Sequence, residues 1–168
     1  NQQIVFPTDA GLLNTARKET ERIIDLLYIQ CPSSTKKPRD YRRIARTEYL
    51  VFSKKRRKTR KEIRKFIRKQ LGYVKRNIAY IETLLNQLEL QRTKAAYLEM
   101  FPAMKNPYPA MFPVSKRDQK LYWVIQQMYE QQQYMYESKT HSVKNRIVNI
   151  YQPYVRPIPR GKDKAATE

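Results

Sequence analysis

The residues of this chain best suited to chemistry are cations, and the densest group lies between Lys54 and Lys69, in the sequence KKRRKTRKEIRKFIRK. Eleven of these sixteen residues are Lys or Arg, and one, Glu62, is acidic. Three apolar residues at positions 63, 66 and 67 interrupt the run, so we expect a helix with one packed side and strongly positive other sides. Such a helix is suited to lie along the phosphate backbone of a nucleic acid.

A second basic group lies between residues 36 and 46 and would extend the same positive surface. Phosphate contacts supply affinity without sequence information, so these residues are expected to position double-stranded DNA rather than read its bases. The candidate DNA-binding residues are Lys36, Lys37, Arg39, Arg42, Arg43, Arg46, Lys54, Lys55, Arg56, Arg57, Lys58, Arg60, Lys61, Arg64, Lys65, Arg68 and Lys69.

Three other interpretations of the basic run stay open: a solvated helix face without a ligand, a nuclear-import signal in KKRRK, and a surface for anionic lipid. Like charges at this density repel one another, which favours a counterion partner over an unliganded face. A lipid-binding helix would need an apolar face rich in Trp and Phe, and the one tryptophan, Trp123, lies elsewhere. Nucleic acid is therefore the favoured partner, and no membrane partner is expected.

Other residue types that carry chemistry are scarce. His141 is the only histidine and Cys31 the only cysteine, too few for a zinc site, and no glycine-rich phosphate loop occurs. The aspartates fall at predicted helix caps, in loops or on solvent-facing positions rather than in converging pairs. His141 follows a predicted helix, whose end a cationic or donor side chain stabilises. We therefore predict no catalytic residue, no metal ligand and no cofactor in this chain.

The elements that must position the basic residues are predicted to be helices. The chain has 168 residues, a formal net charge of +20, 40% apolar residues and three glycines, which favours one compact, helix-rich core. Most of the 13 tyrosines are expected to pack at the edge of that core. No apolar run approaches the ~18–20 residues of a membrane span, and a lone cysteine cannot form an internal disulfide, so we expect a soluble, intracellular protein.

The spacing of apolar residues predicts a mainly α fold with about four helices in an antiparallel, bundle-like arrangement, over 9–28, 40–53, 59–92 and 115–138. The third helix is the longest, contains Gly72 as a possible point of close approach, and is expected to pair antiparallel with the fourth. Its apolar seam is Ile63, Ile67, Leu71, Val74, Ile78, Ile81, Leu85 and Leu88.

Caps and loops separate these helices. N-caps are expected at 7–9, at Asp40 and at Ser115, and the proline-rich segment 101–113 is expected to be a loop. The inward side of the second helix is predicted to hold Tyr41, Ile44, Ala45, Tyr49 and Phe52. The seam of the fourth is predicted to hold Leu121, Ile125, Met128, Gln132 and Met135.

The end of the chain changes character. Residues 146–158 contain β-branched residues and prolines, which predicts a short C-terminal strand followed by an extended arm. A lone strand needs a ladder partner, either residues 3–6 or a sheet outside this chain. We therefore divide the chain into a helical domain, 1–145, and a strand with a tail, 146–168. The first residue is Asn1 rather than Met, which indicates a piece of a longer protein.

Three segments carry a resemblance, and in order they read FPTDAGLLNTARKETERIIDLLY, KKPRDYRRIARTEYLVFSKKRRKTRKEIRKFIRKQLGYVKRNIAYIETLL and MYESKTHSVKNRIVNIYQPYVRPIPRGK. They resemble part of the bacterial insertion-sequence transposases with an RNase H-like DDE catalytic domain. The most specific patterns are PTD-x-x-LLN-x-AR at 7–17, KTHS at 139–142 and QP-x-VRPI-x-RGK at 152–162.

The resemblance implies the helical insertion that interrupts the RNase H-like sheet between its first and second strands. The family's catalytic carboxylates lie on both sides of that segment, so no catalytic residue is carried over to this chain. A divalent metal, magnesium, is implied for the parent transposase, where two ions would activate water or a 3′ hydroxyl. The remainder of the catalytic domain is implied as a partner, and the bacterial cytoplasm, at the nucleoid, as the location.

These features predict a DNA-binding helical insertion domain that helps a DDE transposase grip transposon-end or target DNA during transposition. By itself the chain is expected to be inactive in strand cleavage and joining. The alternative is a non-catalytic oligomerisation or interaction module, in which the seams of the third and fourth helices form a homodimer.

Overall fold

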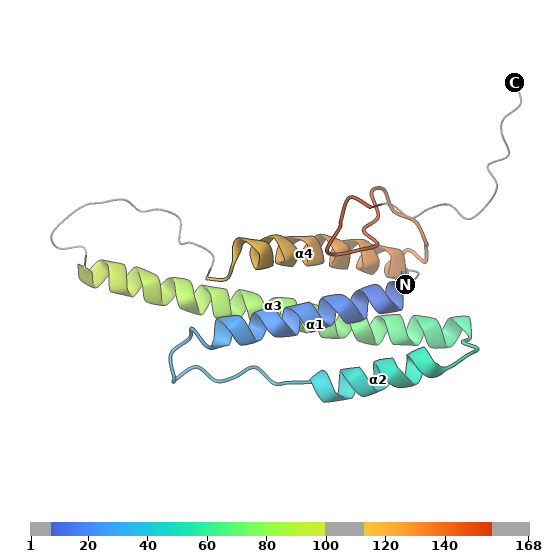
Figure 1. Ribbon diagram of the computed structural model, residues 1–168, viewed down its shortest axis with the longest axis horizontal. Helices are drawn as coiled ribbons and strands as arrows, with labels where there is room; N and C mark the ends of the chain where they lie inside the picture. The colour runs from blue at the N-terminus through green and yellow to red at the C-terminus, as the bar shows by residue number, and fades with distance from the viewer. Residues whose placement is uncertain (1–7, 100–112, 156–168) are drawn as a thin grey trace, which may run out of the picture.

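Four helices build the protein in the computed structural model, which describes residues 8–99 and 113–155 (Figure 1). They are α1 (Asp9–Tyr28), α2 (Arg42–Lys54), α3 (Arg60–Glu99) and α4 (Lys116–Glu137). The prediction of a mainly helical, bundle-like fold is confirmed. None of the helices in the described ranges is long and apolar enough to cross a membrane.

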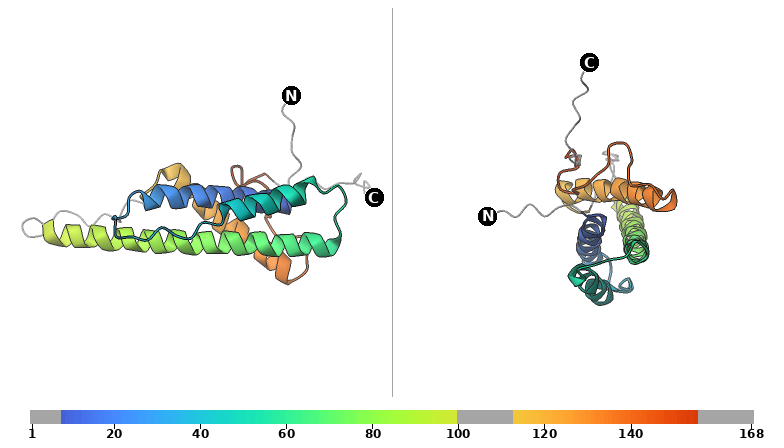
Figure 2. Two further views of the ribbon diagram at one scale, coloured as in Figure 1. Left: turned by 90° about the horizontal axis from the view of Figure 1, so that it is seen from below. Right: turned by 90° about the vertical axis from the view of Figure 1, so that its right-hand side faces the viewer.

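The helices form three layers. α1 and α3 lie side by side in the middle, α4 crosses one side of this pair, and α2 covers the other (Figure 2). α2 returns the chain to the end where α1 began, so α1 and α3 run parallel, while α2 and α4 run in the opposite direction. The predicted antiparallel pairing of α3 with α4 is present, but α3 also packs along the whole of α1.

The core consists of two neighbouring apolar clusters. The first joins α1 residues such as Leu13 to Leu71, Val74 and Ile125, and the second joins Ile23, Ile24 and Leu27 to Ile81, Leu84 and Leu88 of α3 together with Tyr122 of α4. All five predicted seam residues of α4 are buried. These clusters hold α3 against both α1 and α4.

The predicted seam of α3 is wrong at its first position. Ile63 is 40% exposed, whereas Phe66 and Leu84, outside the predicted seam, are buried. The apolar core contacts of α3 with α1 and α4 begin at Ile67, so Ile63 lies beyond the apolar core. Phe66 is buried because Phe52 of α2 stacks on its ring, with centroids 3.9 Å apart.

Two predicted helix starts are confirmed by their caps. Thr8 accepts a hydrogen bond from the Gly11 amide at 3.1 Å, and Ser115 accepts one from the Asp118 amide at 3.2 Å. The start predicted at Asp40 is displaced: the N-cap of α2 is Tyr41.

The inward face predicted for α2 is partly wrong. Ala45 is fully buried, and Tyr49 and Phe52 pack towards Phe66, but Ile44 is 54% exposed. α2 is covered on one side only, and successive helical residues differ by about 100° in direction. The neighbour of a buried Ala45 therefore faces solvent.

The predicted strand is absent from the described part of the C-terminal segment, residues 146–155, which forms turns and bends. Ile147 and Ile150 are buried in the first core cluster. The Ile147 amide donates to Oε1 of Gln131 at 2.8 Å, so a side chain replaces the expected ladder partner. Residues 3–6, the 101–112 part of the proline-rich loop and residues 156–168 lie outside the described residues.

Candidate nucleic-acid interface

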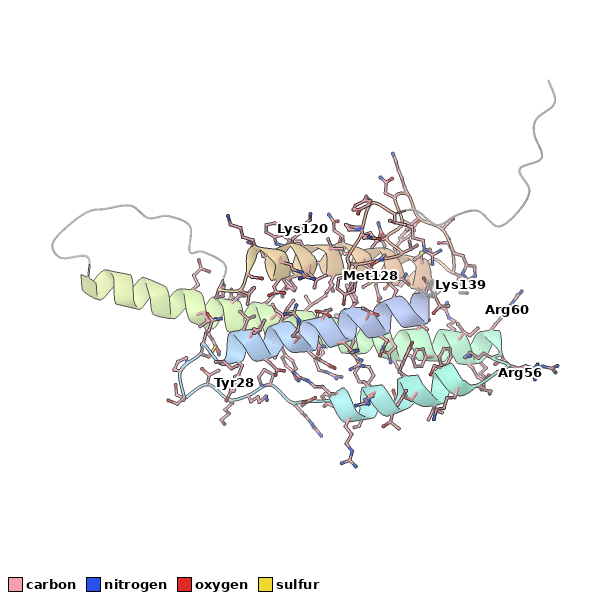
Figure 3. All side chains as sticks on the ribbon, in the orientation of Figure 1. Tyr28, Arg56, Arg60, Lys120, Met128 and Lys139 are labelled. Atoms are coloured by element: carbon pink, nitrogen blue, oxygen red, sulfur yellow. The ribbon has the colours of Figure 1, made fainter. Side chains whose placement is uncertain are left out.

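Residues 54–69, which we call the basic end, lie at one end of the molecule. They comprise the last residue of α2, the turn 55–59 and the first turns of α3, and Figure 3 shows Arg56 and Arg60 projecting there. Apart from the partly covered Lys58, all of its Lys and Arg side chains are exposed. The structure therefore presents the densest basic run of the sequence to solvent as one surface.

A capping box fixes the turn that begins α3. The Glu62 amide donates to Oγ1 of Thr59 at 3.2 Å, and the Thr59 amide donates to Oε2 of Glu62 at 2.9 Å. Lys55 also bonds the Glu62 carboxylate, and these contacts, that of Lys55 first, lower the pKa of Glu62 to about 2. The sequence Thr-Arg-Lys-Glu at 59–62 is the signature of this motif, so the start of α3 is marked at Thr59 in the sequence itself.

Phe66 attaches the basic end to the rest of the protein. It is 6% exposed and lies between Tyr49 and Phe52 of α2. Arg64 makes a second attachment, since its Nη1 donates to the Tyr136 carbonyl at 3.0 Å and its guanidinium lies 4.1 Å from the Tyr136 ring centroid. The start of α3 is therefore held against both α2 and the end of α4.

Several cations of the basic end already have partners. Lys55 pairs with Glu62, and Lys69 pairs with Glu48 at 2.6 Å, a hydrogen bond that raises the Lys69 pKa. Lys58 lies 5.2 Å from the Phe52 ring centroid. The exposed cations of the basic end that form no ion pair or ring contact within the described residues are Lys54, Arg56, Arg57, Arg60, Lys61, Lys65 and Arg68.

One stripe of α3 carries part of this charge. Lys61, Lys65 and Arg68 are exposed and follow one another at spacings of four and three residues, which puts them on one helix face. Gly72 continues that face, and a Cβ added there would meet nothing within 4 Å. The close approach expected at Gly72 is therefore absent within the described chain, and the face is open.

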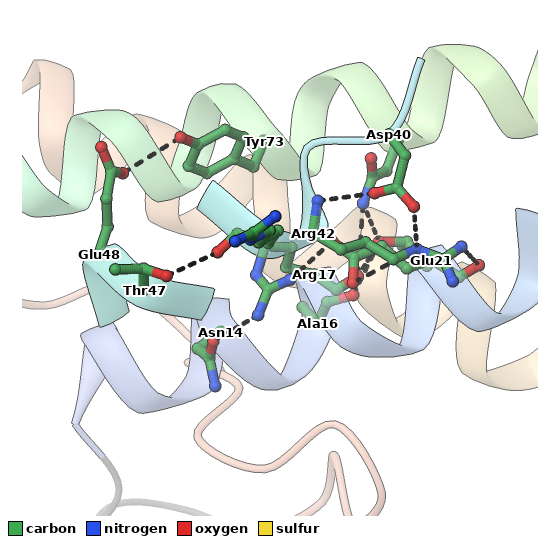
Figure 4. Close-up of polar contacts among 12 residues, drawn as sticks. Asn14, Ala16, Arg17, Glu21, Asp40, Arg42, Thr47, Glu48 and Tyr73 are labelled. Atoms are coloured by element: carbon green, nitrogen blue, oxygen red, sulfur yellow. Dashed lines mark hydrogen bonds and ion pairs between the residues drawn. The ribbon is translucent and has the colours of Figure 1, made fainter. Parts of the chain in front are cut away.

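The second basic group, residues 36–46, is different because acids of α1 lie within reach. Nη1 of Arg42 bonds Asp25 at 2.6 Å. Its Nη2 donates to the Glu21 carbonyl at 2.8 Å (Figure 4). The bond to Asp25 raises the pKa of Arg42. The charge of Arg42, a predicted DNA contact, is thus used to fasten the start of α2 to α1.

The remaining cations of the second basic group fall into two classes, those with a partner in the fold and those exposed without an ion pair. Lys37 lies 3.9 Å from Asp25, and the Arg39 guanidinium lies 5.1 Å from the Tyr41 ring centroid. Lys36, Arg43 and Arg46 are exposed and form no ion pair among the described residues.

A buried polar layer lies beneath Arg42, between α1 and α3. Arg17 is 3% exposed and bonds Glu21 at 2.6 Å and Asn14 at 2.9 Å. Asn77 of α3 donates to Oγ1 of Thr20 at 2.9 Å. The bonds of Arg17 lie within α1, but the layer is buried only because α1 pairs with α3, and that pairing is not visible in the sequence.

Lys139 is an interface candidate that sequence reasoning missed. It is exposed, and Figure 3 shows it at the same end of the molecule as Arg56 and Arg60. It lies seventy residues beyond Lys69 in the chain, so only the fold brings it close to the basic end. No pattern of charge in the sequence marks it.

The capping role predicted for His141 is not observed. Its side chain is exposed and makes no hydrogen bond within the described residues, and its carbonyl accepts one from Nη1 of Arg146 at 2.8 Å. The end of α4 is instead closed by the Ser138 amide, which donates to the Tyr134 carbonyl at 2.9 Å. Across 8–99 and 113–155, no three His, Cys, Asp or Glu side chains gather in a way that could hold a metal ion.

Comparisons of this chain with protein-family models, with curated proteins and with solved structures give no match.

Proposed function

We propose that this chain is a DNA-binding helical domain that grips the phosphate backbone of double-stranded DNA through its basic end. The observation that carries the proposal is the set of seven exposed cations at 54–68 that form no ion pair or ring contact within the described residues. A net charge of +20 adds a long-range field that attracts a polyanion to any part of this surface.

The placement of these cations works against the stability of the fold. Arg60 and Lys61 occupy the first turn of α3, where the helix dipole favours acids and disfavours cations by about 0.3–1 kcal/mol each. Their repulsion from the neighbouring cations adds to that cost. A phosphate backbone would relieve both effects, because each phosphate supplies the negative charge that the site lacks.

The same geometry favours gripping over reading. The stripe of Lys61, Lys65 and Arg68 consists of exposed side chains. Gln70, the amide side chain closest to it in the sequence, is fully buried and is therefore not presented for a bidentate base contact. Phosphate contacts from the stripe fix position and supply affinity without sequence information. We therefore propose equal affinity for transposon-end and unrelated duplexes.

The resemblance to DDE transposases supplies the biological setting of the proposal. In that setting the chain is the helical insertion of the catalytic domain, and it holds transposon-end or target DNA for an active site whose carboxylates and magnesium ions are supplied elsewhere in the parent enzyme. By itself the chain is proposed to neither nick nor join DNA.

The arrangement of the α3 seam favours DNA binding over the alternative of a homodimer formed through that seam. Ile78 and Leu85 pack against the core clusters inside the chain, so they are not presented to a second copy.

A salt series tests the proposed function. Fluorescence anisotropy with a labelled transposon-end duplex and a scrambled duplex should show steep, equal salt dependence for both. Replacing Arg56, Arg57 and Arg60 together with Ala should lower the log–log slope by about two to three units, since each neutralised phosphate contributes about 0.9. An unchanged slope in a folded triple variant would remove the basic end from the interface. A marked preference for the transposon-end duplex would contradict the gripping role.

A further inference from the structure

Lys139 has a backbone conformation that its residue type does not favour. It directly follows Ser138, the C-cap of α4, and its φ is 55°. This left-handed conformation at the position after the C-cap is usually taken by glycine, because a Cβ there crowds the following carbonyl. The other residue of positive φ in the described ranges is Asn145, a type that tolerates this region well.

No contact of the lysine side chain within the described structure explains why lysine, rather than glycine, occupies this position. It is exposed and forms no ion pair, hydrogen bond or ring contact there. A residue held in an unfavourable backbone region without a structural use of its side chain points to a use outside the fold.

The fold places this side chain beside the basic end. Arg64 of α3 contacts both the carbonyl and the ring of Tyr136, three residues before Lys139. Figure 3 shows Lys139 at the same end as Arg60, while Lys120 lies at the other end of α4. Lys139 therefore adds a cation from a different helix to the border of this surface.

The acid closest to Lys139 in the sequence does not pair with it. Glu137, in the last turn of α4, accepts a hydrogen bond from Gln133. The helix dipole of α4 also favours a cation at this end, but that benefit would be kept by a lysine in an unstrained position. The charge of Lys139 is thus available to an anion that meets the basic end.

We propose that Lys139 contacts a DNA phosphate, so that the DNA surface is composite, formed by residues 54–69 together with the end of α4. This inference rests on the proposed function and extends it to a second structural element. A duplex lying across the end of the molecule would then be held by α3 and by the α4 turn, and its angle to the helices would be fixed by both.

Two substitutions of Lys139 in the full 168-residue chain test the inference. Lys139→Gly removes the charge and relieves the backbone, whereas Lys139→Gln removes the charge and keeps the conformation. Both should lower the log–log salt slope for duplex binding by about 0.9. Both also lose the interaction of the charge with the α4 dipole, so the backbone effect is measured between them. The thermal midpoint of Lys139→Gly should lie about 2 °C above that of Lys139→Gln, since the greater freedom of glycine in the unfolded chain offsets part of the relief. A side chain with a purely structural role would not produce an equal loss of slope in two variants of different stability.

Lys120→Gln is the matched control. It removes one exposed lysine from the opposite end of α4, so it should leave the slope unchanged. An unchanged slope in both Lys139 variants, with a reduced slope in the Arg56, Arg57 and Arg60 triple variant, would overturn this inference and leave the proposed function standing. Unchanged slopes in all three would overturn both. A reduced slope in Lys139→Gly but not in Lys139→Gln would assign the effect to the backbone and also overturn the inference.

Discussion

Two arginine-rich regions of this protein have opposite uses. In the layer between α1, α2 and α3, Arg17 and Arg42 bond Glu21 and Asp25. In the basic end, most cations form no ion pair within the described residues. The difference lies in the acids within reach: Glu21 and Asp25 of α1 bond the arginines of the first region, whereas Glu62 and Glu48 pair with only Lys55 and Lys69 among the eleven cations of the second.

This comparison shows that charge density alone does not identify a ligand-binding surface. An arginine whose guanidinium is already bonded to carboxylates loses those bonds when it turns towards DNA, so it gains little by doing so. An arginine with no partner gains a charge-assisted contact and releases counterions from the DNA. The two regions should therefore respond to substitution in opposite ways, one in folding and the other in binding.

The largest effect is expected at Arg17. Replacing it with Met keeps most of its volume and leaves Glu21 half-buried without its closest charge partner, which should lower the free energy of unfolding by about 2–3 kcal/mol. Urea denaturation at neutral pH measures this change. The salt slope of DNA binding should stay unchanged, and a reduced slope would contradict the division between the two regions.

The pH dependence of the Arg17→Met variant sharpens that test. Burial raises the pKa of Glu21 in the folded protein above its usual 4.5, while the Arg17 charge opposes the shift. Without Arg17 the folded pKa rises further, so Glu21 takes up a proton more readily folded than unfolded, and stability increases relative to wild type as pH falls. The loss of unfolding free energy in Arg17→Met, relative to wild type, should be largest at neutral pH and smaller near pH 4.5. The double variant Arg17→Met, Glu21→Gln should show a smaller loss than the single variant at neutral pH.

Smaller and opposite effects are expected from Arg42 and Arg60, with Arg42→Ala changing stability and Arg60→Ala changing DNA binding. Arg42→Ala removes the 2.6 Å bond to Asp25 and should cost about 1 kcal/mol of stability, since the pair is partly exposed, with no change in salt slope. Arg60→Ala should leave stability within about 0.5 kcal/mol and lower the slope by about 0.9. The paired measurements are urea denaturation and anisotropy on each variant. If both variants reduced the slope equally, the bonded arginines would have to belong to the interface.

The sequence predicted the local features of this fold well. Apolar spacing located all four helices, and Thr8 and Ser115 marked two starts, because caps and amphipathic faces depend on residues a few positions apart. The parallel pairing of α1 with α3 was not predicted, since it depends on how α2 returns the chain. The buried layer of Arg17, Thr20 and Asn77 follows from that pairing and was missed for the same reason.

The candidate site was predictable in part. The basic run stood out in the sequence because its residues are contiguous, and the structure exposes it. Charge counting could not separate Arg42 from Arg43, two adjacent arginines, because Asp25 and Glu21 approach only the first of them. Lys139 could not be found either, since its conformation and its place beside α3 are properties of the fold.

The smallest expected effect tests whether α3 itself lies against DNA. Gly72 is exposed on the same face as Lys61, Lys65 and Arg68. A Cβ there meets nothing within 4 Å, so Gly72→Ala should raise the free energy of unfolding by up to about 1 kcal/mol, the difference in helix propensity. A loss of stability in urea denaturation would show that this position is not an open helical site.

The binding side of the Gly72→Ala experiment completes the comparison between the two regions. The substitution changes no charge, so the salt slope should equal that of the wild type. If only the side chains of the stripe reach the phosphates, the affinity for DNA should also be unchanged. A lower affinity at the same slope would mean that the DNA backbone approaches the helix closely enough to meet one methyl group. The basic stripe would then be a contact surface along α3, extending from the basic end towards the middle of the helix, where Lys75 is also exposed.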